Sequence, residues 1–218
     1  SKDYSLGKLT TEEYIRDPRF EVIGVGIKLN DKETEWASGT HKQLREYLQT
    51  NFPWANAMVL AHNTMFDGAI LNWVFDISPR VYTDTLCISR GFHGVEDSSS
   101  LKAISERYNL GVKGTEVFDA IGKKREDFTE SELSAYGDYC INDVDLTYKA
   151  FLHMAKDFPK NELKLIDLTL RMFVEPVLDL DLGLLEQHLA ETRYEKESLL
   201  QQCAVMGVSK DDLMSNPK

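Results

Sequence analysis

Up to about residue 158, short apolar segments rich in β-branched residues alternate with segments of helical periodicity. Strands are expected at 20–28, 35–37, 57–62 and 81–87. Helices are expected at 41–51, 67–75, 101–108 and 129–156. Such alternation is typical of an α/β domain, in which helices cover a sheet. Beyond it the pattern is helical only, at 162–173 and 184–206. The sequence therefore predicts an α/β domain at 1–158 and a helical segment at 159–218.

The charge balance argues against one class of partner. The chain has 218 residues and a formal net charge of −11, whereas contacts to nucleic acid phosphates require Lys and Arg. Two features can overcome this: a carboxylate cluster that holds divalent cations, or a basic groove elsewhere in a larger protein. The sequence contains no apolar run long enough to predict a membrane span. The three cysteines lack metal-ligand spacing, which favours reduced thiols and a cytoplasmic location.

The long predicted helix carries the most informative pair of residues. Thr129 and Glu132 form a capping box that opens it. Tyr139 and Asp143 are four residues apart, so they share a face beside the apolar stripe, where a helix can border a cleft. Taken alone, so short a pattern favours the simpler reading of a solvated Tyr and Asp on a helix edge.

A second signal follows the strand expected at 57–62. Asn63, Phe66 and Asp67 lie where that strand leads into a helix, and functional groups in open α/β sheets gather at the carboxyl ends of strands. Asp67 in the first helical turn is also favoured by the helix dipole. Asn63 and Asp67 could therefore simply cap the helix.

Together the two signals resemble one family. Asn63-x-x-Phe66-Asp67 resembles the second motif of DEDD-superfamily exonucleases, and Tyr139-x-x-x-Asp143 resembles the third motif of the tyrosine subclass. Between them, Asp84-Thr85-Leu86 and the segment 100–113 are similar to family A DNA polymerase exonuclease domains. The resemblance implies an RNase H-like mixed sheet flanked by helices and followed by an all-helical segment.

The resemblance extends to the phage-type branch of family A. Residues 139–147 and 168–177 are similar to that branch, so that 1–175 resembles the exonuclease and 176–218 resembles the first helices of the polymerase region. The first family motif, Asp-x-Glu-Thr, is not found before residue 20. Asp31-Lys-Glu33 has similar spacing but falls in a predicted hairpin turn. The chain is therefore expected to start just after the first motif and to be weakly active or inactive alone.

The resemblance also implies a mechanism and partners. Asp67 and Asp143 would be ligands of two Mg²⁺ or Mn²⁺ ions, which prefer hard oxygen donors. Tyr139 would orient the attacking water, while Asn63 and Phe66 would flank the substrate end. The implied partners are a single-stranded DNA 3′ end or primer-template DNA and the polymerase region of the same polypeptide, with no membrane. The implied role is proofreading in DNA replication, in the host cytoplasm if the source is a phage.

Two alternatives remain open. The first is a free-standing DEDD exonuclease acting on RNA, although the segment 168–177 and the helices after it resemble polymerases instead. The second is an inactive exonuclease fold that serves as a binding module. The residues encoded upstream of Ser1 would distinguish them.

Overall fold

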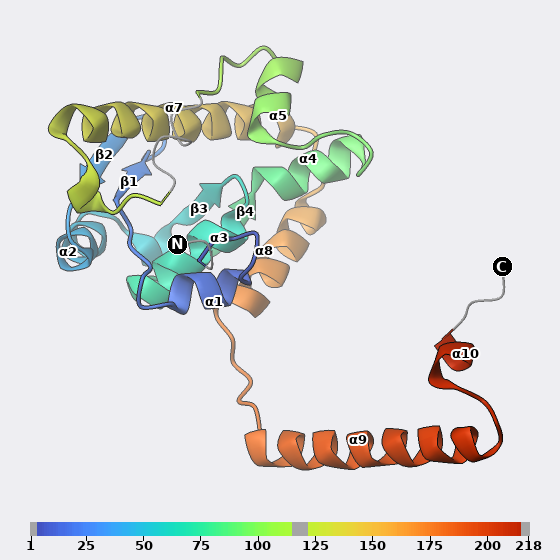
Figure 1. The fold of residues 1–218 in the computed structure, drawn as a ribbon. Coiled ribbons are helices and arrows are strands. Elements are labelled where there is room, and N and C mark those ends of the chain that lie inside the picture. Colours follow the sequence, from blue (N-terminus) through green and yellow to red (C-terminus); the bar gives the residue numbers. More distant parts are fainter. Residues whose placement is uncertain (1–3, 115–121, 215–218) are drawn as a thin grey trace. The chain divides into compact units, whose positions relative to one another are not determined.

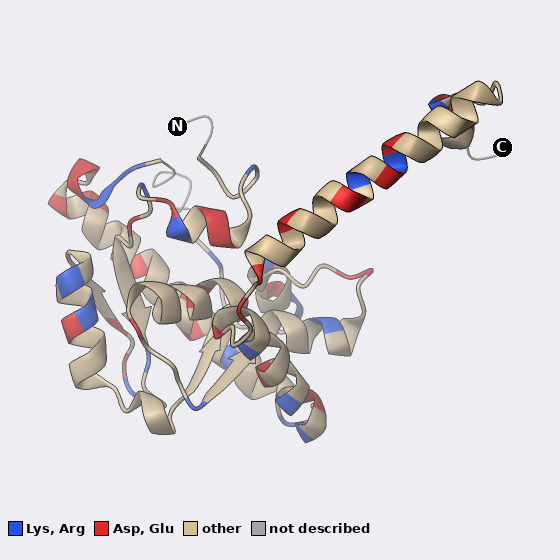
Figure 2. Ribbon diagram, turned by 90° about the horizontal axis from the view of Figure 1, so that it is seen from below, with Lys and Arg blue, Asp and Glu red and all other residues tan. Residues whose placement is uncertain are grey.

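A computed structural model describes residues 4–114 and 122–214, which form two compact units (Figure 1). The first unit is Ser1–Pro176 and the second is Val177–Lys218. No helix among the described residues is long and apolar enough to cross a membrane. Charged residues of both signs are spread over the helices (Figure 2). Residues 115–121, within the polar stretch before the long helix, lie outside the described residues.

The strands of the first unit form two pairs. β1 (Gly24–Ile27) and β2 (Glu35–Ser38) are an antiparallel hairpin in which Gly24 pairs with Ser38. β3 (Met58–Ala61) and β4 (Val81–Asp84) are parallel. Parallel and antiparallel pairing thus both occur, but no ladder joins the two pairs within the described residues. An isolated strand pair is only marginally stable, so packing against helices must support each pair.

Helices cover both pairs. The first unit contains α1 (Thr11–Arg16), α2 (His41–Asn51), α3 (Thr64–Ala69) continued by a π-helical turn at Ile70–Val74, α4 (Thr85–His93), α5 (Leu101–Arg107), α7 (Glu130–Met154) and α8 (Lys160–Val174). Short 3₁₀ turns lie at Trp54–Asn56 and Arg125–Asp127. This arrangement of small sheets and many helices is compatible with an RNase H-like exonuclease domain.

Three apolar clusters hold these elements together. The first joins α2 to the π-helical turn and the hairpin through Leu44, Leu48, Phe75 and Ile77. The second joins α4, α5 and α7 through Ile88, Ile104, Ala150 and Met154. The third joins β4 to α8 through Tyr82, Leu170 and Val174. Helix α7 is anchored through the second cluster, and β3, which leads into α3, packs through Val59 against the third.

The long helix α7 is in close contact with the hairpin. It runs along β1 and β2 and also contacts α4 and α5 (Figure 1). Gly137 lies under the Trp36 ring, and a Cβ at this position would be 2.7 Å from Trp36 Cδ1. Only glycine permits so close an approach. This contact fixes the helix turn that precedes Tyr139.

The structure differs from the predicted elements in three main respects. The strand expected at 81–87 ends at Asp84, and α4 begins directly after it and runs to His93. The Asp84 carboxylate accepts the Leu86 N–H at 2.8 Å, and this capping starts the helix early. The helix expected from Asp67 begins at Thr64. Helix α1 was not predicted, although Thr10 and Glu13 form a capping box.

The first compact unit is longer than the domain predicted at 1–158. It includes α8, because α8 packs against β4 and α3. The second unit contains α9 (Leu182–Val205) and α10 (Lys210–Met214). Many leucines of α9 are exposed within it, including Leu182, Leu184, Leu185 and Leu189. The roles assigned to the two parts of the chain stay predictions.

Candidate active site

The junction between β3 and α3 is built by a buried aspartate from the neighbouring strand. Asp84 is 2% exposed, and its two carboxylate oxygens accept the backbone N–H groups of Asn63 at 3.0 Å and Thr64 at 3.1 Å. Asn63 adopts a left-handed conformation with φ 75°, which asparagine tolerates better than most residues. The Asn63 side chain does not cap the helix. The start of α3 is therefore capped by Asp84 and not by the Asn63 side chain.

Asp67 is exposed on the first turn of α3, in a setting unfavourable for a negative charge. Surrounding protein atoms and the nearby Asp84 carboxylate raise the pKa of Asp67 to about 6, while a backbone hydrogen bond opposes this rise. The residue therefore remains accessible to solvent although its carboxylate is poorly solvated. A bound cation would relieve this penalty by compensating the charge.

Phe66 belongs to a group of aromatic rings. Its ring centroid lies 6.3 Å from that of Tyr14 in α1, and Tyr14 stacks on Tyr4 at 4.5 Å with an interplanar angle of 9°. Phe66 itself is half-buried. Part of its ring remains available beside Asp67, as stacking on a nucleobase would require.

Tyr139 and Asp143 are half-buried one turn apart on α7, and one cation contacts both. The Lys113 ammonium donates to the Tyr139 hydroxyl oxygen at 2.8 Å and forms an ion pair with Asp143 Oδ2. The other carboxylate oxygen, Asp143 Oδ1, is buried and has no hydrogen-bond partner among the described residues. These contacts argue against the reading of two unconnected residues on a solvated helix edge.

The charges of Asp67 and Asp143 both affect the pKa of Cys140. Burial raises the pKa of this thiol to about 12, and the negative charges of Asp143 and Asp67 both add to the rise, against the opposing charge of Lys113. One thiol on α7 therefore experiences the carboxylate of its own helix and that of α3. Both carboxylates are thus among the charges that act on this thiol.

The donor set fits a divalent metal in part. Carboxylate oxygens are the ligands that Mg²⁺ and Mn²⁺ prefer, and the unsatisfied Asp143 Oδ1 is an atom that a cation would satisfy. Across the described residues, however, no group of three or more His, Cys, Asp or Glu side chains could hold a metal. Asp67 and Asp143 therefore fit as part of a metal site rather than as a complete one.

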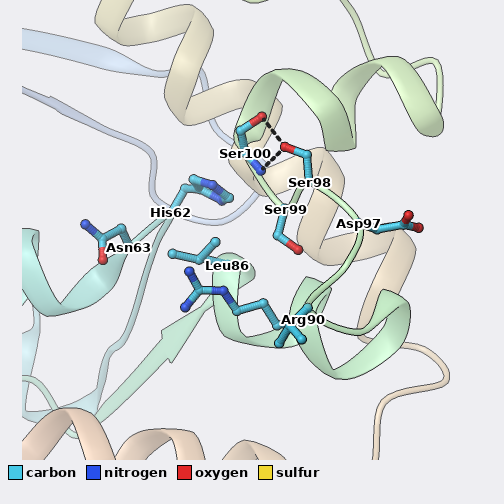
Figure 3. Close-up of a pocket in the computed structure, with 9 residues that line it drawn as sticks. His62, Asn63, Leu86, Arg90, Asp97, Ser98, Ser99 and Ser100 are labelled. Carbon is cyan, nitrogen blue, oxygen red and sulfur yellow. Dashed lines mark hydrogen bonds between the residues drawn. The ribbon is translucent and has the colours of Figure 1, made fainter. Parts of the chain in front are cut away.

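An open cavity of about 600 Å³ adjoins the β3–α3 junction (Figure 3). Asn63 and His62 line it together with α4 and the following loop, through Leu86, Arg90, Val95 and Asp97–Ser100. His62 Nδ1 lies 2.9 Å from the Thr85 hydroxyl. Burial, with a smaller effect of the Lys113 charge, lowers the pKa of His62. Asp67 and Asp143 do not line this cavity, which therefore lies beside the candidate site.

The comparison with protein families gives the class of the domain. Residues 11–159, more than half of the chain, match the family model described as 3′-5′ exonuclease. The chain therefore belongs to this family of exonuclease domains, of the type found in family A DNA polymerases. No curated protein matched the chain. Membership supports hydrolytic nuclease activity and implies DNA binding, and domains of this family generally use divalent metal ions.

Sequence reasoning assigned no role to Asp84, Lys113, His62 or Arg90. Asp84 and Lys113 lay within segments that carried the family resemblance, but only the folded chain shows that they contact the motif residues. For Asp84 there was a usable signal, because an aspartate at the end of a buried strand can cap a following helix. For Lys113 there was none, because it lies 26 residues before Tyr139 in a segment without periodicity.

Proposed function

We propose that this chain is the proofreading 3′→5′ exonuclease region of a phage-type family A DNA polymerase, in the tyrosine subclass of the DEDD superfamily. Its role would be to remove nucleotides from frayed or single-stranded 3′ ends during DNA replication. The observation that carries the proposal is the family match over residues 11–159, a range that includes both motifs.

In this proposal Asp67 and Asp143 hold divalent cations, Mg²⁺ or Mn²⁺. When bound, the metals would supply the activated water and stabilise the departing 3′-oxygen. The Tyr139 hydroxyl would orient that water. Phe66 would stack on the terminal base, and Asn63 would lie beside the terminal nucleotide. Water adds to the phosphorus, the 3′-oxygen of the preceding nucleotide takes up a proton and leaves, and a nucleoside 5′-monophosphate is released.

The two strand pairs support the proposal that a further strand carries the first motif. Both β1 and β3 contact α7, and in the part of the chain that the structure describes each has only one paired edge. A strand between them would join the pairs into one mixed sheet, as the RNase H-like fold requires. It would also supply the further carboxylates that a complete metal site needs besides Asp67 and Asp143.

The exposed apolar residues of α8 support a neighbouring polymerase region. Leu165, Leu168 and Met172 recur at helical spacing and are 55%, 56% and 72% exposed. An apolar face of this kind indicates contact with another part of a protein. The polymerase region of the same polypeptide is the partner that the proposed function provides.

A cleavage assay tests the proposed function. A polypeptide extended upstream to include the first motif should shorten a 5′-labelled single-stranded DNA in single-nucleotide steps, and should require Mg²⁺. Asp67→Ala and Asp143→Ala should each remove most of this activity. Asp145→Ala is the matched control, because Asp145 lies on the same helix but pairs with Thr34 and Lys28. Wild-type rates in either site variant, or faster degradation of RNA, would contradict the proposal.

A further inference from the structure

Lys113 occupies the space between the two candidate catalytic side chains of α7. Its ammonium contacts the Tyr139 hydroxyl oxygen and Asp143 Oδ2, and it lies 4.7 Å from the centroid of the Tyr139 ring. The Lys113 and Asp143 side chains are only 23% and 25% exposed. The pair is therefore partly shielded from water, where ion pairing is stronger than on an open surface.

The backbone that carries Lys113 is fastened to the same helix. Asn142 Nδ2 donates to the Val112 carbonyl at 3.0 Å, on the residue directly before Lys113. Gly111, at φ 143°, lies against Leu146: a Cβ there would be 3.1 Å from a Leu146 methyl carbon. The segment thus attaches to α7 on either side of Asp143. These contacts hold the backbone of Lys113 against α7, so its position does not depend on a flexible surface side chain alone.

The two carboxylate oxygens of Asp143 differ in their contacts. Oδ2 is paired with Lys113, whereas Oδ1 is buried and has no hydrogen-bond partner among the described residues. A divalent cation would satisfy Oδ1. The same cation would lie close to the Lys113 ammonium and repel it, because like charges in a partly buried site are weakly screened. The Asp143 carboxylate therefore binds either the Lys113 ammonium or the divalent cation, but not both together.

We propose that Lys113 is a built-in counter-ion that competes with a divalent metal for Asp143 and leaves this carboxylate when the metal binds. In the metal-free protein it neutralises Asp143 and prevents a half-buried charge from standing unpaired. After its release it lies beside the reacting centre, where a phosphate would attract it. The inference rests on the proposed function in one respect, the role of Asp143 as a metal ligand.

Mn²⁺ binding without DNA, followed by electron paramagnetic resonance of the free ion, tests this competition. Lys113→Met should bind Mn²⁺ about fivefold more tightly than wild type, the effect expected when a partly exposed ion pair is removed. Lys28→Met is the matched control. Lys28 forms an ion pair at 3.1 Å with Asp145, which lies on α7 as Asp143 does, and its side chain is 16% exposed. The Mn²⁺ affinity of this variant should equal that of wild type.

The outcomes separate the two proposals. Unchanged or weaker Mn²⁺ binding in Lys113→Met overturns the competition. Unchanged binding in Asp143→Asn removes the ligand role of Asp143, and the proposed function fails with it. A measurement on the wild-type chain covers the case in which Lys113→Met does not fold. Lys113 should react faster with an amine-modifying reagent when Mn²⁺ is present, and Lys28 should not. Equal Lys113 reactivity with and without Mn²⁺ also overturns the inference.

Discussion

Replacing Asp67 by Asn should stabilise the protein at neutral pH in the absence of metal. The folded state raises the pKa of Asp67 from 3.8 to about 6. A proton therefore binds the folded chain more tightly than the unfolded chain. Ionised Asp67 then destabilises the fold, from near pH 4 upward and fully above pH 6. Asparagine keeps the shape of the side chain and cannot ionise, so it removes this penalty.

The magnitude follows from the size of the shift. About two pKa units correspond to roughly 3 kcal/mol if the carboxylate were fully shielded. Asp67 is exposed, so solvent screening reduces the expected gain to about 1 kcal/mol. For a chain of this length that is an increase of about 2–4 °C in melting temperature.

The assay is thermal unfolding in EDTA at pH 7.5 and at pH 4, followed by tryptophan fluorescence. All three tryptophans, Trp36, Trp54 and Trp73, lie in the first unit, so the signal reports on the unit that contains the site. Asp67→Asn should melt higher than wild type at pH 7.5, and the difference should shrink at pH 4. Equal or lower stability at pH 7.5 would refute the argument that Asp67 is poorly solvated.

Asp145→Asn is a control of opposite sign. Burial alone would raise the pKa of Asp145, but the Thr34 hydrogen bond and Lys28 outweigh it and lower the pKa. Ionised Asp145 therefore stabilises the fold above the ordinary carboxylate pKa, and this stabilisation is lost on acidification through the lowered value. The variant should melt below wild type at pH 7.5. Destabilisation by both substitutions would indicate a general intolerance of Asn.

Three further predictions concern Tyr139, the chain alone and Gly137. Tyr139→Phe, in a polypeptide with the first motif, should slow single-turnover cleavage of single-stranded DNA about 10²-fold with KM nearly unchanged; a rate within about twofold of wild type would make Tyr139 structural. Residues 1–218 alone should degrade DNA poorly at saturating Mg²⁺, because two carboxylates replace few of the waters that Mg²⁺ must lose; robust activity there would mean that other acidic residues complete the site. Gly137→Ala should destabilise the chain by about 1–3 kcal/mol in urea unfolding, because its Cβ would clash with Trp36; unchanged stability would show that the indole moves without penalty.

Much of the fold was predictable because local patterns determine it. The hairpin is confirmed, as is helix 41–51, and the capping box at Thr129 marks the start of α7. The boundaries that were wrong depend on distant partners. α4 begins early because Asp84 serves as its N-cap, and the same carboxylate binds the backbone of Asn63, 21 residues away. Sequence periodicity carries no information about a side chain that caps two helices.

The candidate site was predictable only as a set of separated residues. Asp67 and Asp143 could be named from motif spacing, but only the folded chain shows that both charges act on Cys140. The apolar stripe on α7 is buried in part, at Leu146, Ala150 and Met154. Lys113 stayed without a role because its partners lie 26 and 30 residues further along the chain.

Anomalous scattering from Mn²⁺ would show whether Asp67 and Asp143 belong to one metal site. Crystals of a polypeptide that includes the first motif would be soaked with Mn²⁺ and thymidine 5′-monophosphate. We expect a Mn²⁺ peak bound by Asp143, with Asp67 bound directly or through water to the same or an adjacent ion. We also expect the Lys113 ammonium to have left Asp143. Carboxylates more than about 12 Å apart, too far to share a two-metal site, or Mn²⁺ bound elsewhere would contradict the account.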